Sequence, residues 1–195
     1  PAVRESASHS SPLTRSLKLS IDDTASVLRS DLLGKVQWEP FREAVDLIYK
    51  NIQLTASSPK SKSKSKSNAG PKSVMVTSAV AGEGRTTLAI GLALSAARSQ
   101  KRVLLIDADL RRPSLHEQIG LSNRYGLTTL SDSVETPLPV SVMLANTLFD
   151  ILPAGSFSED PVLLLNSRRM RELVAKFEQQ YDYVVFATSY ELGQD

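Results

Sequence analysis

From Ser73 onward, short apolar runs alternate with helical segments, and this pattern limits the fold more than any other feature of the chain. Four runs are apolar nearly throughout, which is typical of strands buried on both faces: residues 74–77, 103–106, 149–152 and 183–186. A helical pattern covers residues 86–99, and a second helical stripe comprises Met170, Leu173, Val174 and Phe177. Strands that alternate with helices predict an α/β fold with a mainly parallel sheet covered on both faces.

A glycine-containing segment joins the first predicted strand to the helix that follows it. It reads Ala81-Gly82-Glu83-Gly84-Arg85-Thr86-Thr87. Small residues and glycines let backbone N–H groups converge on an anion, and the helix N-terminus adds partial positive charge. These residues therefore predict a phosphate-binding loop (P-loop), with the Thr86 hydroxyl as a candidate Mg²⁺ ligand.

The loop departs from the strict pattern G-x-x-x-x-G-K-[ST] at two positions. Ala79 takes the first glycine position, and Arg85 takes the lysine position. For the loop taken alone, a strand-to-helix turn that binds nothing is therefore the alternative interpretation.

A second motif follows the next buried strand. Residues 103–106 lead directly into Asp107-Ala108-Asp109-Leu110-Arg111-Arg112-Pro113. Carboxylates at a strand end beside a phosphate loop provide hard oxygen ligands for Mg²⁺ and a candidate proton acceptor. An aspartate after a strand can also simply organise a turn, and the two arginines can either meet phosphate or stay solvated. Taken with the loop, the two aspartates favour a Mg²⁺–nucleotide site.

Together the two motifs resemble those of the bacterial tyrosine kinases (BY-kinases) of capsule and exopolysaccharide synthesis. The likeness extends to Glu39-Pro40-Phe41-Arg42, to Asp160-Pro161 and to Tyr181-Asp182-Tyr183-Val184-Val185, so that it covers residues 39–195. The resemblance implies a Rossmann-like three-layer P-loop NTPase fold. Residues 73–195 are expected to contain this kinase-like domain incompletely, truncated at the C-terminus, because the family has further strands.

The resemblance also implies a reaction, its residues and its partners. The family transfers the γ-phosphoryl group of ATP to tyrosines, largely on neighbouring subunits of a ring, and regulates polysaccharide polymerisation and export. Residues 81–87 and Arg111 would bind the nucleotide, while Thr86, Asp107 and Asp109 would coordinate Mg²⁺. Asp107, Asp109 and Arg85 would act in catalysis. Implied partners are ATP or ADP, a tyrosine-containing protein in trans, a second copy of the chain, and a polysaccharide co-polymerase or transmembrane activator. This implies a cytoplasmic location at the inner face of the bacterial inner membrane.

Three departures from the family pattern concern catalysis and assembly. Arg85 replaces a lysine with a broad planar fork, Ala187 stands where the third nucleotide motif has an aspartate, and Val45 stands where the ring contact has an arginine. Losing one positioned charge in an active site typically costs about 10²–10³ in rate. A catalytically inactive nucleotide-binding or scaffolding module (a pseudokinase) is therefore an alternative. A partition or cell-division ATPase ranks lower, because Val80 stands where those proteins have an early lysine.

The first 72 residues divide into three parts. Residues 1–38 are expected to be flexible, with a weak helix at 21–33, because most of them lack apolar density. Residues 39–55 have apolar side chains spaced by three and four, which predicts an amphipathic helix anchored on the core by Trp38 and Phe41. Residues 56–72 alternate lysine with serine and are expected to form a disordered linker. A basic strip for anionic lipid or nucleic acid is the alternative.

Composition argues against several other classes of protein. The 195-residue chain has no cysteine and two isolated histidines, which gives neither disulfides nor the ligand spacing of a zinc site. Its formal charge of +2 is too small to indicate a nucleic-acid-binding protein. No apolar run reaches the roughly 18–20 residues that span a bilayer. His116 has no partner identifiable in the sequence and is expected on a helix surface.

Overall fold

The structure, a computed structural model, describes residues 35, 37–56, 72–80, 82–132 and 137–189. Most of three predicted segments lies outside this range: the flexible residues 1–38, the weak helix at 21–33 and the disordered linker at 56–72. These three stay predictions.

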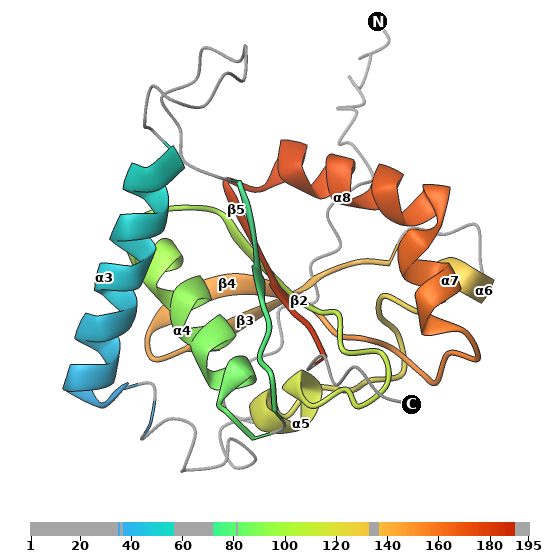
Figure 1. The fold of residues 1–195 in the computed structure, drawn as a ribbon, viewed down its shortest axis with the longest axis horizontal. Coiled ribbons are helices and arrows are strands. Elements are labelled where there is room, and N and C mark those ends of the chain that lie inside the picture. The colour runs from blue at the N-terminus through green and yellow to red at the C-terminus, as the bar shows by residue number, and fades with distance from the viewer. Residues whose placement is uncertain (1–34, 36, 57–71, 81, 133–136, 190–195) are drawn as a thin grey trace, which may run out of the picture.

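Five strands in the described residues form one sheet with the order β1-β5-β2-β4-β3 (Figure 1). Their bounds are β1 (Ser73–Val76), β2 (Val103–Asp107), β3 (Val140–Leu144), β4 (Thr147–Leu152) and β5 (Tyr183–Ala187). Strands β1, β5, β2 and β4 run parallel, whereas β3 pairs antiparallel with β4. The four predicted strands and the mainly parallel sheet are confirmed, but burial on both faces is wrong for β1, an edge strand in which Val76 is buried and Met75 is exposed.

Strand β3 is the one strand in the described residues that the sequence pattern did not predict. It lies at the edge of the sheet, with Val142 and Leu144 buried and Met143 exposed between them. Ala145 and Asn146 connect it to β4 with φ values of 49° and 57°, as two-residue hairpin turns require. Because only one face of β3 is buried, it lacks the continuous apolar run that marks the other strands.

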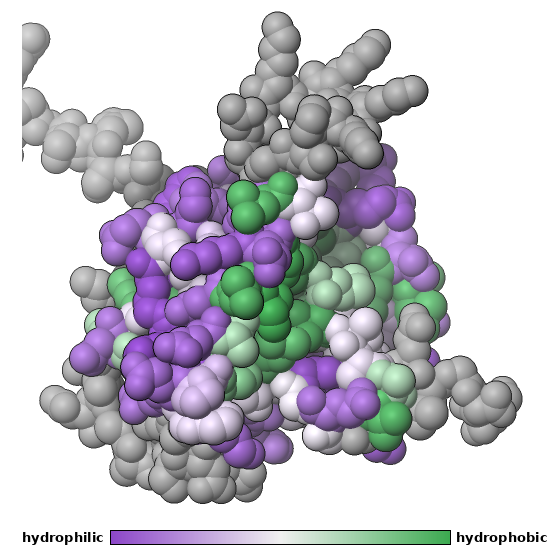
Figure 2. Space-filling view, turned by 60° about the vertical axis from the view of Figure 1, so that its left-hand side comes forward, coloured by the Kyte–Doolittle hydropathy of each residue, from purple (hydrophilic) through white to green (hydrophobic). Residues whose placement is uncertain are grey.

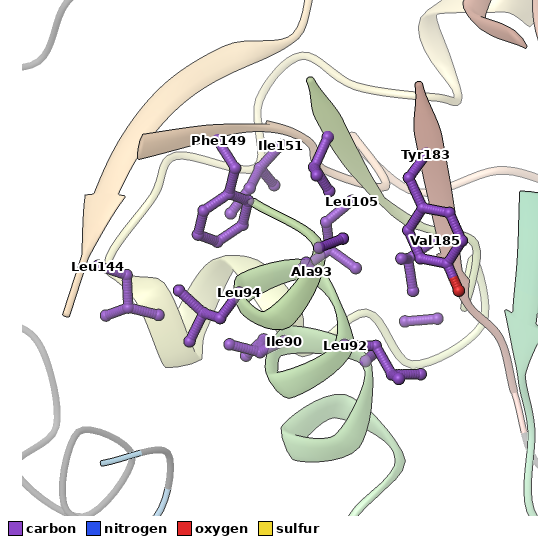
Figure 3. Close-up of a cluster of buried hydrophobic side chains, with 14 of the residues drawn as sticks. Ile90, Leu92, Ala93, Leu94, Leu105, Leu144, Phe149, Ile151, Tyr183 and Val185 are labelled. Atoms are coloured by element: carbon purple, nitrogen blue, oxygen red, sulfur yellow. The ribbon is translucent and has the colours of Figure 1, made fainter. Parts of the chain in front are cut away.

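Helix α4 (Arg85–Arg98) covers one face of the sheet. All of its residues from 89 to 96 are buried. Figure 3 shows its side chains, among them Ile90 and Leu94, gathered with Leu105, Phe149 and Val185 of the sheet. The predicted buried helix is therefore confirmed.

Helix α3 (Glu39–Ala56) lies beside α4 on the same side of the molecule (Figure 1). The Tyr49 ring meets the Tyr183 ring edge-on, with centroids 5.3 Å apart. The ring of Phe41 lies against Gly91, where an added Cβ would come within 3.1 Å of it. The amphipathic helix and the anchoring by Phe41 are thus confirmed. The prediction for Trp38 is wrong: it precedes the helix and is 63% exposed.

The opposite face of the sheet is covered by α8 (Arg168–Gln180), next to the short α7 (Pro161–Asn166). Met170, Leu173 and Phe177 of α8 are buried in one cluster with sheet residues Leu104 and Val184, which confirms the predicted helical stripe. Two further short helices are α5 (Leu115–Ile119) and α6 (Thr129–Asp132). No helix in the described residues has both the length and the hydropathy to cross a membrane.

Apolar side chains also reach the surface. Figure 2 shows a band of hydrophobic residues that runs between hydrophilic surfaces on one side of the molecule. Large apolar side chains that are more than half exposed include Met75 of β1 and Leu47 and Leu54 of α3. Strand β1 pairs with β5 on one side and has no strand on its other side among the described residues.

Gly126 marks a close approach of two backbone segments. A Cβ built there would lie 2.2 Å from the carbonyl oxygen of Pro153 and 2.4 Å from the amide nitrogen of Gly155. We expect Gly126→Ala to lower the free energy of unfolding by about 1–3 kcal/mol, because the backbone must shift to admit the methyl group. Urea unfolding measures this change. The exposed Ser156 provides the control, since Ser156→Ala is expected to change little; equal stabilities of the two variants would contradict the close approach.

Candidate functional site

The segment predicted to bind phosphate joins β1 to α4, as expected from the sequence. Gly82 and Gly84 have φ values of 84° and 85°, a region that glycine adopts without strain. A Cβ built at either position would meet nothing within 4 Å, so there is open space over the loop at both glycines. Ala81 lies outside the described residues, and its predicted role stays untested. The loop has room for an anion beside the N-terminus of a long helix.

Glu83 folds back onto the backbone of its own loop. Its Oε2 accepts hydrogen bonds from the N–H groups of Ala79 and Val80, each at 3.1 Å. These bonds tie the start of the loop to the turn that precedes α4. In this structure the Glu83 carboxylate therefore stabilises the shape of the loop, and its predicted contact with nucleotide stays untested.

Asp107 ends β2 and is 2% exposed. Its Oδ1 accepts a hydrogen bond from the N–H of Asp109 at 3.2 Å, and its Oδ2 accepts one from the N–H of Leu115 at 3.1 Å. Burial raises the pKa of Asp107 to about 6, and the backbone hydrogen bonds oppose this rise only in part. The carboxylate is thus held in a fixed orientation at the strand end but is costly to ionise.

Ala187, which stands where the resemblance calls for an aspartate, pairs with Asp107 across β5 and β2. Side chains alternate between faces along a strand. Leu105 and Val185, two residues earlier on each strand, belong to the cluster that contains α4. Asp107 and Ala187 therefore point to the α4 side of the sheet, and Ala187 is 5% exposed there. Position 187, where the resemblance calls for an aspartate, therefore lies directly beside Asp107.

Arg85 begins α4 and reaches the segments that follow β2 and β5. Its guanidinium donates a hydrogen bond to the carbonyl oxygen of Thr188 and forms an ion pair with Asp109, with Nη1 3.7 Å from Oδ2. Both side chains of the pair are largely buried, at 15% and 10% exposure. Asp109 also accepts a hydrogen bond from the N–H of Arg112 at 3.0 Å. The structure thus brings Arg85 and Asp109 together as predicted, but their charges balance each other.

Thr86 lies in the first turn of α4, and its hydroxyl hydrogen-bonds to the hydroxyl of Ser114 at 3.3 Å. Ser114 was not predicted as a site residue. This hydrogen bond joins residues that are 28 positions apart in the chain, and no local sequence pattern indicates it. Because Ser114 precedes Leu115, whose N–H binds Asp107, the Thr86 hydroxyl lies close to the end of β2.

Three candidate residues remain to be placed: Thr87, Arg111 and His116. Thr87 follows Thr86 in α4 and is half-buried. Arg111 is exposed, and it makes no hydrogen bond or ion pair with another described residue. His116 is only partly on the surface of α5 as expected: its Nδ1 is buried without a hydrogen-bond partner among the described residues.

The oxygen atoms at this site suit a divalent cation held together with phosphate. The carboxylates of Asp107 and Asp109 and the hydroxyl of Thr86 are hard oxygen donors. Within the described part of the chain, no group of three or more His, Cys, Asp or Glu side chains could hold a metal. Mg²⁺ usually takes one or two protein carboxylates and completes its shell with phosphate oxygens and waters. The donor set therefore fits Mg²⁺ bound with a nucleotide.

The raised pKa of Asp107 predicts how the stability of the ligand-free protein depends on pH. Between the ordinary pKa of 3.8 and the folded-state value of about 6, the folded protein holds this proton more tightly than the unfolded chain does. The free energy of unfolding is therefore expected to fall by up to about 3 kcal/mol as the pH rises through this window. Asp182 has the opposite effect in a lower window, because its hydrogen bonds to Arg102 lower its pKa to about 2.

Urea unfolding of the wild type and of Asp107→Asn at pH 4.5 and pH 7 measures this dependence. The wild type is expected to lose more stability than the variant over this range, because asparagine has no proton to release. Equal losses in the two proteins would show that Asp107 is not costly to ionise.

Comparison with known proteins identifies the family. The model of the CobQ/CobB/MinD/ParA nucleotide binding domain matches residues 74–188, a range that holds both motifs. The tyrosine-protein kinase YwqD of Bacillus subtilis is 42% identical over 118 residues, which are 60% of this chain and 49% of YwqD. The chain thus spans about half the length of that relative.

Solved structures agree with this match. The kinase domain of the Escherichia coli tyrosine kinase ETK superposes with a TM-score of 0.67 at 27% identity, covering 84% of this chain and 60% of that one. The chimerical protein CapA2B2 gives a TM-score of 0.70 at 23% identity, with 90% of this chain and 77% of that one covered, and supports the fold alone. The predicted Rossmann-like P-loop NTPase fold is confirmed. The chain belongs to the CobQ/CobB/MinD/ParA family of nucleotide-binding domains, and its homologues are bacterial tyrosine-protein kinases.

Proposed function

We propose that this chain binds ATP with Mg²⁺ at the loop between β1 and α4 and transfers the γ-phosphoryl group to tyrosine hydroxyls. The observation that carries the proposal is the position of Asp107. It is buried at the end of β2, held by two backbone N–H groups, and faces the helix that begins at the phosphate loop. Relatives with similar sequences are named tyrosine-protein kinases, which supports this reaction over other uses of the same fold.

Each residue of the site has a role in this proposal. Backbone N–H groups of residues 82–87 and the N-terminus of α4 bind phosphate oxygens. Thr86, Asp107 and Asp109 would hold Mg²⁺, which would neutralise negative charge on the phosphates. One of the two carboxylates accepts the proton of the tyrosine hydroxyl. Arg85 contributes positive charge to the phosphates once its ion pair with Asp109 opens.

A second candidate function is nucleotide binding without phosphoryl transfer. Two observations favour it: Ala187 leaves the position beside Asp107 without a carboxylate, and Arg85 is held by Asp109 and by the carbonyl of Thr188. Phosphoryl transfer depends on positioned charge, so both features weaken catalysis more than binding. A partition-type ATPase is a third and weaker candidate, and its distinguishing property would be ATP hydrolysis without tyrosine phosphorylation.

By resemblance, the proposed setting is capsule or exopolysaccharide synthesis. The chain would act in the cytoplasm, at the inner face of the bacterial inner membrane, with a polysaccharide co-polymerase or transmembrane activator. Val45 argues for a ring contact weaker than in the family, because it is 2% exposed and packs in the core.

Two measurements test these proposals. Incubation with Mg²⁺, ATP and a synthetic glutamate–tyrosine copolymer is expected to produce phosphotyrosine. Titration calorimetry with ATP and with ADP, each with Mg²⁺, is expected to give measurable heats. Binding without phosphotyrosine would favour the second candidate, and the absence of both signals would contradict both functions.

A further inference from the structure

The tyrosines in the described residues differ sharply in accessibility. Tyr49 and Tyr183 are 6% and 1% exposed, and their rings contact each other in the core. Tyr181 is half-buried, and its hydroxyl donates a hydrogen bond to Asp150 at 2.7 Å. None of these three hydroxyls can accept a phosphoryl group without local unfolding. Tyr125, in contrast, is 74% exposed.

The loop that carries Tyr125 is fastened on both sides to the segment after β4. On one side, the amide of Asn123 donates to the carbonyl of Gly155 at 2.6 Å and accepts from its N–H at 2.8 Å. On the other side, the N–H of Leu127 donates to the carbonyl of Pro153 at 2.9 Å. The fixed base of this loop therefore presents Tyr125 outward.

This base lies at the edge of the sheet that carries the candidate site. Residues 153–155 follow β4, which is parallel to β2 and hydrogen-bonded to it. The carboxyl ends of parallel strands share one edge, and neighbouring strands lie about 4.8 Å apart. Asp107 ends β2 on this edge. Tyr125 and the phosphate loop thus occupy the same edge of the sheet in a fixed relation.

We propose that Tyr125 is a phosphate acceptor for the candidate site of a second copy of this chain. This inference rests on the proposed tyrosine-kinase function. Hydrogen bonds on both sides of Tyr125 restrain its loop from moving toward the site of its own chain, whereas a second copy can approach the exposed ring. Arg124, also exposed, adjoins Tyr125 and offers a guanidinium to the phosphate once it is attached.

The transfer balances with ATP as the donor. A bond forms between the Tyr125 oxygen and the γ-phosphorus, while the bond from that phosphorus to the bridging oxygen of ADP breaks. The tyrosine proton passes to a carboxylate of the Asp107–Asp109 pair of the other copy, and ADP leaves.

Mass spectrometry of the chain after incubation with Mg²⁺ and ATP tests the assignment. Phosphate is expected on Tyr125, and Tyr125→Phe is expected to lose most of the phosphate on the chain. Tyr49→Phe is the matched control, because it removes a buried hydroxyl, and it is expected to lose none. A glutamate–tyrosine copolymer in the same reaction reports transfer that is independent of the tyrosines of the chain.

Mixing two variants tests whether the acceptor belongs to a second copy. Asp107→Asn keeps the Tyr125 hydroxyl but lacks the site acid, whereas Tyr125→Phe keeps Asp107 but lacks the acceptor hydroxyl. Phosphate on Tyr125 of the Asp107→Asn chain is the expected result. If wild type acquires this phosphate and the mixture does not, transfer occurs within one chain and the second-copy assignment is wrong.

The remaining outcomes separate this inference from the proposed function. Phosphorylated copolymer with no phosphate on Tyr125, or with phosphate on Tyr190 instead, overturns the inference and leaves the kinase function in place. No phosphate on either the copolymer or the chain overturns both.

Discussion

Replacing Asp107 with asparagine is expected to lower tyrosine phosphorylation by a factor on the order of 10²–10³, because it removes a positioned charge from the site of phosphoryl transfer. Asparagine keeps the size of the side chain and one oxygen that can accept a backbone N–H. It removes the negative charge that would hold Mg²⁺ and accept a proton. The rate of copolymer phosphorylation at saturating ATP measures the effect.

Asp182→Asn is the matched control for the removal of a carboxylate. Asp182 precedes β5, at the opposite edge of the sheet from Asp107, and pairs with Arg102 at the surface. Its loss is expected to leave the rate unchanged. Thermal unfolding of both variants checks that each is folded, since Asp107→Asn leaves one of two buried N–H groups without its acceptor. A folded Asp107→Asn protein with the wild-type rate would remove Asp107 from the proposed mechanism.

The second large effect is an increase in the rate of tyrosine phosphorylation. Arg85→Lys combined with Ala187→Asp is expected to raise copolymer phosphorylation by a factor on the order of 10²–10³. An aspartate at position 187 would stand beside Asp107 on the α4 side of the sheet, because the two positions are paired across β5 and β2. Lysine at position 85 replaces a guanidinium that bonds to Asp109 and to Thr188 with a compact ammonium.

The same double variant is expected to be less stable than the wild type without ligand. Two neighbouring carboxylates in a buried position repel each other, and Mg²⁺ with ATP would relieve the repulsion. Arg85→Lys with Ala187→Asn is the matched control, because asparagine has the size of aspartate without its charge. A gain that appears equally with asparagine would show that charge at position 187 is not its cause. A wild type already as fast as the double variant would show that neither residue impairs catalysis.

The buried strands and the helices that cover them could be predicted from sequence because burial on both faces of a strand requires an apolar run. Strands β2 and β5 are buried at every position, and their apolar runs stand out. Strand β3 was not predicted because only Val142 and Leu144, which alternate with the exposed Met143, are buried in it. The exposure of Trp38 also could not be read from its apolar character, since a large aromatic side chain just before a helix has no neighbour to cover it.

The candidate site could be predicted only as far as chain position determines it. The loop follows β1 and Asp107 ends β2 of one parallel sheet, so they meet at one edge. Contacts between side chains depend on the folded arrangement of these segments. Examples are the bond of Thr86 to Ser114 and the fold-back of Glu83 onto its own loop. The ion pair of Arg85 with Asp109 is of the same kind, and no spacing rule indicates it.

Helix α3 shows that separation along the chain and separation in space are different matters. Residues 57–71 divide α3 from the sheet in sequence, yet Tyr49 and Tyr183 share one core. Proteolysis within this stretch would divide the chain into two pieces, each with an apolar surface that the other piece now covers. An 18-residue helix alone is marginally stable in water, and the remaining piece would expose the side of α4 that α3 now covers. Tags, cleavage sites and expression boundaries for this protein therefore belong before α3.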